Sequence, residues 1–246
     1  MLAVVWAPTH TTYWRAEGPY LPTLASKTAL VEETRLFLLT YERLSNMEMA
    51  LQALLNEVLA QRSRRTRTTI VAIIRSRLLR WNAPTWVLQN LMAFAQESHL
   101  DALRAALLLH IARQDHLLYD FVQQVIVPRR QRGEFRIFIS DVQTFFDTAQ
   151  KEHPEVGHWS FETRLRLSRG MLATLRDCGL LKGAVQKHIT FPFIPEQVVT
   201  HLIRLLQAEG VTQEQMATHP DWNLWLWSPA QAKAAIERFF HEEQGV

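Results

Sequence analysis

"SFETRLRLSRGMLATLRDCGLLKGAVQKHITFPFIP", residues 160–195, predicts one long helix followed by two short strands. Ser160 suits the position before the helix, because a serine hydroxyl accepts a hydrogen bond from the free N–H groups of a first turn. Gly179 suits the helix end, where a left-handed backbone conformation is common. The stretch therefore predicts a helix over 161–178 and a β hairpin over 182–193.

The residues before this stretch complete a recognisable order of elements. A helix over 115–127 is expected to end at Pro128, since proline cannot continue it. "EFRIFIS" (134–140) alternates and is rich in Phe and Ile, which predicts a short strand, and a further helix follows. The order helix, strand, helix, helix, strand, strand is that of a winged helix, with 161–178 as recognition helix and 182–193 as wing.

The N-terminal half has helical periodicity throughout. The candidate helices there cover 27–43, 46–60, 64–81, 84–97, 99–113 and 115–127. Further helices are expected over 195–207 and 229–241. The sequence thus divides into an N-terminal arm (1–25), a helical bundle (26–128), a winged-helix-like domain (129–207) and a Trp-rich C-terminal cap (208–246).

Aromatic residues mark both ends of the chain. The arm has no clear period, and we expect it to lie over the core through Trp6, Tyr13, Trp14 and Tyr20. In the cap we expect the indoles to pack on the bundle through Trp222, Trp225 and Trp227.

The charge is unevenly distributed along the chain. The formal net charge is +3, but residues 58–187 carry +9, whereas residues 1–57 carry −2 and residues 188–246 carry −4. Of the 27 basic residues, 22 are arginine. This excess reflects either a planar fork that suits phosphate oxygens or a GC-rich genome that favours arginine codons. A basic middle between acidic ends indicates a surface that binds a polyanion.

The most basic stretch is "LAQRSRRTRTTIVAIIRSRLLRWNAP" (59–84), with seven arginines and no acidic residue. Without an acidic neighbour, pairing along the helix cannot neutralise these arginines. On a helical wheel the apolar face, expected to be buried, holds Ile70, Ile74, Leu78 and Trp81. The opposite face holds Arg65, Thr69, Ser76 and Arg80, with Arg77 at its edge. We expect DNA phosphates, rather than solvent alone, to face Arg62, Arg64, Arg65, Arg67, Arg77 and Arg80.

Three smaller basic groups are further candidates for DNA contact. In the helix over 161–178, Leu165, Leu172 and Leu175 form the inner stripe. The outer face is expected to hold Arg166, Gly170, Ala173 and Thr174, flanked by Arg169. The loop before the first strand carries Arg129, Arg130 and Arg132, and the wing carries Lys182 and Lys187.

Motifs of catalysis are missing from the sequence, which has no glycine-rich phosphate loop, nucleophile elbow or zinc-protease motif. His110 and His116 are neighbours on adjacent predicted helices, but the sequence names no third ligand. We therefore expect no enzyme activity, no catalytic residue, no metal site and no cofactor. The single cysteine, Cys178, is expected to be packed, in a cytoplasmic protein. Apolar runs fall short of the ~20 residues that span a bilayer, so we expect no membrane association.

Three segments in order carry a resemblance to a known family. Residues 54–78 have a leucine-ended helix followed by a basic helix, and residues 107–126 read "LLLHIARQDHLLYDFVQQVI". Residues 139–181 contain Asp-x-x-x-Phe-Phe and His-Pro-Glu. Over 25–195 the chain resembles the BrxA family of the BREX (bacteriophage exclusion) phage-defence systems.

The resemblance implies a fold, a function and partners. The fold would be mainly α, with a NusB-like N-terminal helical bundle, a winged-helix-like α/β segment and a helical C-terminal cap. The protein would be non-enzymatic, bind DNA and work beside a methyltransferase, a phosphatase-like protein and ATPases. By matching position, the basic element corresponds to Arg62, Arg65 and Arg67, and the start of the recognition-like helix to Thr163 and Arg166.

Three hypotheses for the function follow. The first is a component of the defence complex that binds double-stranded DNA. The second is a protein-interaction scaffold of the same complex, whose arginines dock acidic partners. The third is a NusB-like RNA binder. A salt titration separates the first two, because phosphate binding weakens linearly on a log–log plot for any DNA sequence.

Overall fold

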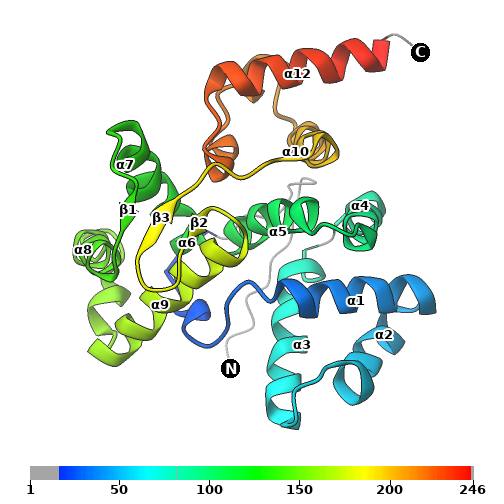
Figure 1. Cartoon of the computed structure of the whole chain (residues 1–246), viewed down its shortest axis with the longest axis horizontal. Helices are drawn as coiled ribbons and strands as arrows, with labels where there is room; N and C mark the ends of the chain where they lie inside the picture. Colours follow the sequence, from blue (N-terminus) through cyan, green and yellow to red (C-terminus); the bar gives the residue numbers. More distant parts are fainter. Residues whose placement is uncertain (1–16, 82, 245–246) are drawn as a thin grey trace.

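The computed structural model describes residues 17–81 and 83–244, so the expected role of Trp6, Tyr13 and Trp14 lies outside the described residues. The described residues form a mainly helical fold with one small antiparallel sheet (Figure 1), which confirms the mainly α part of the expected class. Helix α5 (Asp101–Gln114) occupies the middle of the molecule and buries side chains on nearly every face. A helix that is apolar all round is typical of a core position.

Helices before α5 form one side of the molecule (Figure 1). They are α1 (Val31–Leu44), α2 (Met47–Ala53), a π-helical turn (Leu54–Val58), α3 (Arg64–Leu78) and α4 (Thr85–Gln96). The expected helix from residue 27 begins later, because Leu30 has a left-handed φ of 57° and a separate 3-10 turn, η1 (Thr23–Ala25), precedes it. The Asn46 side chain caps α2 by accepting from the Met49 N–H at 2.9 Å.

The expected stop at Pro128 is wrong. Helix α6 (His116–Phe121) continues through a π-helical segment (Val122–Ile126) into α7 (Val127–Gln131), with the proline at the start of α7. Proline is tolerated in the first turn of a helical segment, where its missing N–H is not needed. Consequently Arg129 and Arg130 stand on a helix and not in a loop.

The next elements follow the expected order. They are β1 (Arg136–Ile137), α8 (Ile139–Ala149), a 3-10 turn η4 (Pro154–His158), α9 (Phe161–Asp177), β2 (Leu181–Lys182) and β3 (Lys187–Ile189). The sheet is antiparallel in the order β1–β3–β2, with Arg136 opposite His188 and Leu181 opposite Ile189. The strand expected over 134–140 is shorter, because the Asp141 carboxylate accepts from the Phe138 N–H at 2.7 Å and starts α8 there.

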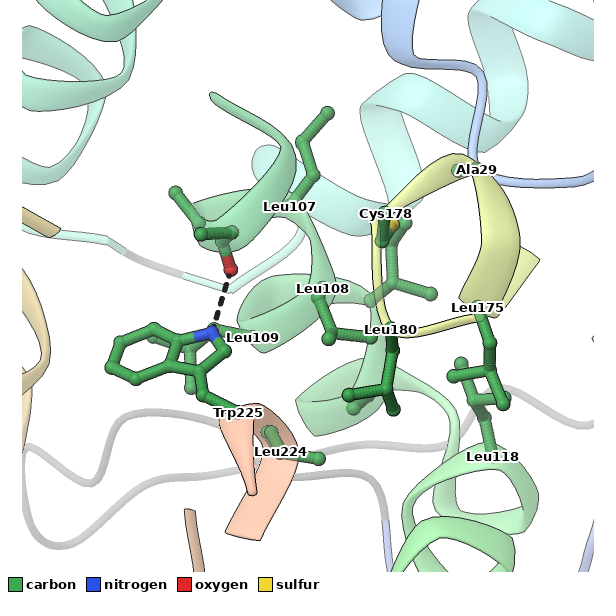
Figure 2. Packing of buried hydrophobic residues seen from close by; sticks show 14 of the residues in the cluster. Ala29, Leu107, Leu108, Leu109, Leu118, Leu175, Cys178, Leu180, Leu224 and Trp225 are labelled. Atoms are coloured by element: carbon green, nitrogen blue, oxygen red, sulfur yellow. Dashed lines mark hydrogen bonds between the residues drawn. The ribbon is translucent and has the colours of Figure 1, made fainter. Parts of the chain in front are cut away.

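The C-terminal elements pack against α5 and one another. They are α10 (Glu196–Ala208), α11 (Gln213–Met216), a 3-10 turn η5 (Pro220–Trp225) and α12 (Pro229–Gln244). Figure 2 shows the Trp225 indole on α5, where its Nε1–H donates to the Ala105 carbonyl at 3.2 Å. The same view draws Leu108 of α5 together with Cys178 and Leu180 as members of one cluster of buried residues. One hydrophobic core therefore joins the N-terminal, middle and C-terminal parts, and the division into four segments stays a prediction.

The face of α9 that we expected to be open is covered. Gly170 and Thr174 are buried, because η1 lies against this side of the helix. A Cβ atom added at Gly170 would stand 1.8 Å from the backbone oxygen of Leu24. Only glycine permits so close an approach, so the N-terminal segment and not a ligand occupies this surface.

We expect Gly170→Ala to destabilise the protein by about 1–3 kcal/mol, the usual cost of overpacking, because its new methyl group must push η1 away. The gain in helix propensity, about 1 kcal/mol, acts in the opposite direction and is smaller than the clash. Urea unfolding measures the difference. Gly157→Ala is the control, since its Cβ would meet nothing closer than 3.5 Å. Equal stability of the wild type and Gly170→Ala would mean that η1 is not seated on α9.

Candidate nucleic-acid interface

Helix α3 buries the apolar face that its sequence predicts. Ile70, Ile74 and Leu78 are at most 2% exposed, and Trp81 beyond the helix end is 6% exposed. The open face is rotated from the expected one, because Thr69 and Ser76 are half-buried. The residues that are fully open on α3 are Arg64, Arg65, Thr68, Ala72 and Arg75.

Arg75 is the residue that the sequence reasoning missed. It stands eleven positions after Arg64, three helical turns along the same side, and Thr68 and Ala72 lie between them. That spacing is visible in the sequence and could have found it. Arg64 and Arg75 are thus about 16 Å apart along the helix axis.

Five exposed arginines on and beside α3 form what we term the α3 arginine face: Arg64, Arg65 and Arg75 lie on the helix, Arg62 precedes it and Arg80 follows it. Within residues 17–81 and 83–244, none of their guanidinium groups has an ion pair or a hydrogen-bond acceptor. The start of α3 also directs free backbone N–H groups outward, which favours an anion there. These exposed guanidinium groups are therefore available to bind an external anion.

Two expected members of this surface are corrected by the structure. Arg77 points inward and donates to the carbonyls of Thr28 and Ala29 at 2.9 and 2.8 Å. Burial lowers the pKa of its guanidinium to about 10, so it stays charged at neutral pH. Arg67 is half-buried and donates to the Gln61 carbonyl at 2.9 Å, which closes the loop before α3. The guanidinium groups of both arginines therefore bind backbone carbonyls of the protein itself.

The basic group at α7 and β1 is largely neutralised by its own neighbours. Arg129 pairs with Asp141 at 2.5 Å and with Glu134 at 3.4 Å. Arg132 pairs with Glu134 at 2.8 Å. The Arg130 guanidinium lies 5.3 Å from the centre of the Phe191 ring, a cation–π arrangement.

The hairpin and α9 contribute fewer free cations than expected. Lys187 is 7% exposed, and its Nζ donates to the carbonyls of Gly183 and Ala184 at 2.6 Å each, which corrects its assignment as a wing contact. Lys182 is exposed. On α9, Arg166 pairs with Glu162 at 2.8 Å, and Arg169 is exposed.

His110 and His116, which we expected to lie near each other, contact different residues. His110 is buried, and its Nε2 lies 3.0 Å from Nε2 of His201 on α10. Burial lowers the pKa of His110 to about 3, and it lowers that of His201 as well. Both rings are therefore neutral core residues at physiological pH. His116 instead lies beside Asp120 and His153, a cluster treated below.

Fold and surface together define a class: a mainly helical protein with a small antiparallel sheet and an exposed face of unpaired arginines. The chain belongs to the BrxA family, whose family model matches residues 18–205. It is similar to the BREX protein BrxA from Bacillus cereus (strain H3081.97), with 25% identity over 104 residues. The matched region covers 42% of this chain and 52% of that protein, so the chain spans about half the length of this relative.

The fold also resembles a solved structure. The crystal structure of an uncharacterized protein from Magnetospirillum magneticum matches with a TM-score of 0.61 and 15% identity, covering 79% of this chain and 100% of that chain. Identity at this level shows the fold alone. Among the described residues, every helix is too short or too polar to cross a lipid bilayer.

Proposed function

We propose that this protein is a non-enzymatic component of a BREX phage-defence complex that binds double-stranded DNA in the cytoplasm. Membership of the BrxA family, with a relative named BREX protein BrxA, supports the defence role. On this proposal its partners are the methyltransferase, the phosphatase-like protein and the ATPases of the same system.

The α3 arginine face is the observation that carries DNA binding. Elsewhere on the surface, the arginines at α7 and α9 mostly face carboxylates at 2.5–3.4 Å. By contrast, Arg64, Arg65 and Arg75 face no carboxylate among the described residues. Over the ~16 Å of α3 that these arginines span, duplex DNA presents about ten phosphate charges, one per ~1.7 Å.

The segment from α7 to β3 plays a secondary part in this proposal. Its element order and its sheet order β1–β3–β2 favour a winged-helix relationship, and the helices before it favour a NusB-like bundle. Because η1 covers one side of α9, the exposed cations that this segment offers to DNA are Arg169 on α9 and Lys182 on the hairpin, together with Arg166, which already pairs with Glu162. We therefore assign phosphate binding chiefly to α3.

A salt titration of wild-type protein tests the proposal. For two unrelated duplexes, the logarithm of the association constant should fall linearly with the logarithm of the salt concentration. The slope should be about −4.5 if all five arginines of the face contact phosphates. Fluorescence anisotropy of labelled duplexes provides the measurement. Because phosphate contacts carry no sequence information, both duplexes should give the same slope.

The two alternatives predict different outcomes of the same experiment. A protein scaffold would show no measurable duplex binding at low salt, while an acidic partner protein would bind in a salt-sensitive way. An RNA binder would release the labelled duplex when unlabelled RNA competes at equal nucleotide concentration, whereas unlabelled duplex would compete weakly. Either result would remove duplex DNA as the ligand.

A further inference from the structure

A compact group of potential metal ligands lies away from the arginine face. His116 and Asp120 stand one turn apart on α6, and His153 follows α8 in the turn that leads into η4. One ligand atom from each residue lies within 4.8 Å of the other two. The three side chains are 18–30% exposed, so an ion could reach them from solvent.

Hydrogen bonding fixes which nitrogen of His116 is available. Its Nδ1 lies 3.2 Å from the carbonyl oxygen of Gly18, which can only accept, so Nδ1 carries the hydrogen. The lone pair of Nε2 then lies 3.3 Å from Oδ2 of Asp120. Two acceptors thus face one another, an arrangement that requires a proton or a cation between them.

The other two ligands are oriented in the same way. Nδ1 of His153 lies 3.2 Å from the Glu155 carboxylate, so Nε2 is the nitrogen of His153 that we assign to a metal ion. The Tyr20 hydroxyl donates to Oδ2 of Asp120 at 2.5 Å, and the Tyr20 ring stacks on the His153 ring at 3.6 Å between centroids. Partners of this kind around each ligand are typical of metal sites, where they set ring orientation and tautomer.

From this geometry we propose a divalent transition-metal site formed by Nε2 of His116, Nε2 of His153 and the Asp120 carboxylate. Two imidazoles and one carboxylate suit Zn²⁺ and its first-row neighbours better than Mg²⁺ or Ca²⁺, which prefer oxygen ligands. Three protein ligands leave at least one coordination position for water.

The site would fasten the N-terminal segment to the body of the protein. Gly18 and Tyr20 support two of the ligands, and they lead directly into η1, the turn whose Leu24 covers Gly170 on α9. An ion held by α6 and the turn before η4 would fix these supports in place. Metal binding would thereby stabilise the covered state of α9.

The test uses the full chain after chelator treatment and dialysis. Co²⁺ titration followed by visible absorption should show one equivalent bound, and Zn²⁺ should displace it. Asp120→Asn, which keeps the shape and the acceptor for Tyr20, should weaken Co²⁺ binding by at least about 100-fold, as should His153→Ala; outer partners alone are typically worth about 10–100-fold. His99→Ala, an exposed histidine before α5, should bind like the wild type.

Thermal unfolding with and without Zn²⁺ is a second measurement, which also applies to variants of reduced stability. Zn²⁺ should raise the midpoint of thermal unfolding of the wild type and of His99→Ala, because an ion that binds only the folded state stabilises it, and it should leave Asp120→Asn unchanged. The proposal is overturned if the wild type binds neither ion. It is equally overturned if Asp120→Asn binds Co²⁺ as tightly as the wild type, since the ion then sits elsewhere.

Discussion

Arg113→Met is expected to destabilise the folded protein by about 3–5 kcal/mol, the usual effect of removing one partner from a buried ion pair. Arg113 is 3% exposed and lies at the centre of a buried polar network. Its Nε donates to Asp221 at 2.8 Å, and its two terminal nitrogens donate to Glu209 at 2.7 and 3.0 Å. Methionine would leave the buried Asp221 carboxylate and the partly buried Glu209 carboxylate without the cation that faces them.

The size of this effect follows from what the network joins. Arg113 belongs to α5, Glu209 directly follows α10, and Asp221 lies in η5, where it also accepts from the Tyr119 hydroxyl at 2.9 Å. Three parts of the fold that are distant in sequence thus share one guanidinium. With a typical total stability of about 5–15 kcal/mol, the loss is a large fraction of the whole.

Arg104→Met is the matched control for this prediction. It stands on the same helix but is 45% exposed, with a 3.8 Å contact to Asp101 that is worth little in water. Its effect should stay within about 0.5 kcal/mol. Urea unfolding followed by circular dichroism measures both variants. If the two variants unfold at the same urea concentration, the buried network does not hold these elements together.

The second large effect concerns DNA. The triple variant Arg64→Gln, Arg65→Gln, Arg75→Gln should bind duplex DNA about 100-fold more weakly, at roughly 1 kcal/mol for each lost hydrogen-bonded phosphate contact. The loss should be equal for unrelated sequences, because phosphate contacts position a protein without reading bases. The slope of the logarithm of the association constant against the logarithm of the salt concentration should become shallower by about 2.7. Each of the three phosphates that the variant no longer neutralises accounts for about 0.9 of that change.

A second triple variant, Arg104→Gln, Arg176→Gln, Arg238→Gln, is the control for net charge. It removes the same charge from arginines that are 43–66% exposed and already face carboxylates. Affinity for DNA should change little. Anisotropy titrations at several salt concentrations measure both triple variants. Equal weakening by the two would mean that overall charge, and not the α3 arginine face, attracts the DNA.

Local sequence signals predicted much of the fold. The N-cap at Ser160, the period of α3 and the short strands all depend on residues close in the chain, and α9 begins and ends within one residue of its predicted limits. The contact of η1 with α9 could not be predicted this way. It joins residues near 24 and 170, and the signal at Gly170 is only a missing side chain.

Long-range contacts also explain the errors in the candidate site. In the folded chain, backbone carbonyls from other positions lie within hydrogen-bond distance of Arg77 and Lys187. The local sequence around these residues gives no sign of this difference from Arg64. The helical wheel found the buried face of α3 correctly but misplaced the open face, so Arg75 was missed. His116 and Asp120 have a visible four-residue spacing, yet their third partner, His153, is 33 residues beyond Asp120 and is brought in only by the fold.

The most direct measurement of the central claim is arginine footprinting with phenylglyoxal, read by mass spectrometry with and without saturating duplex DNA. We expect DNA to protect Arg64, Arg65 and Arg75 strongly. Arg238 is exposed and belongs to α12, a helix that is well separated from α3 in Figure 1, so it should react at the same rate in both samples. Unchanged reactivity of the three α3 arginines at saturating DNA would contradict the account.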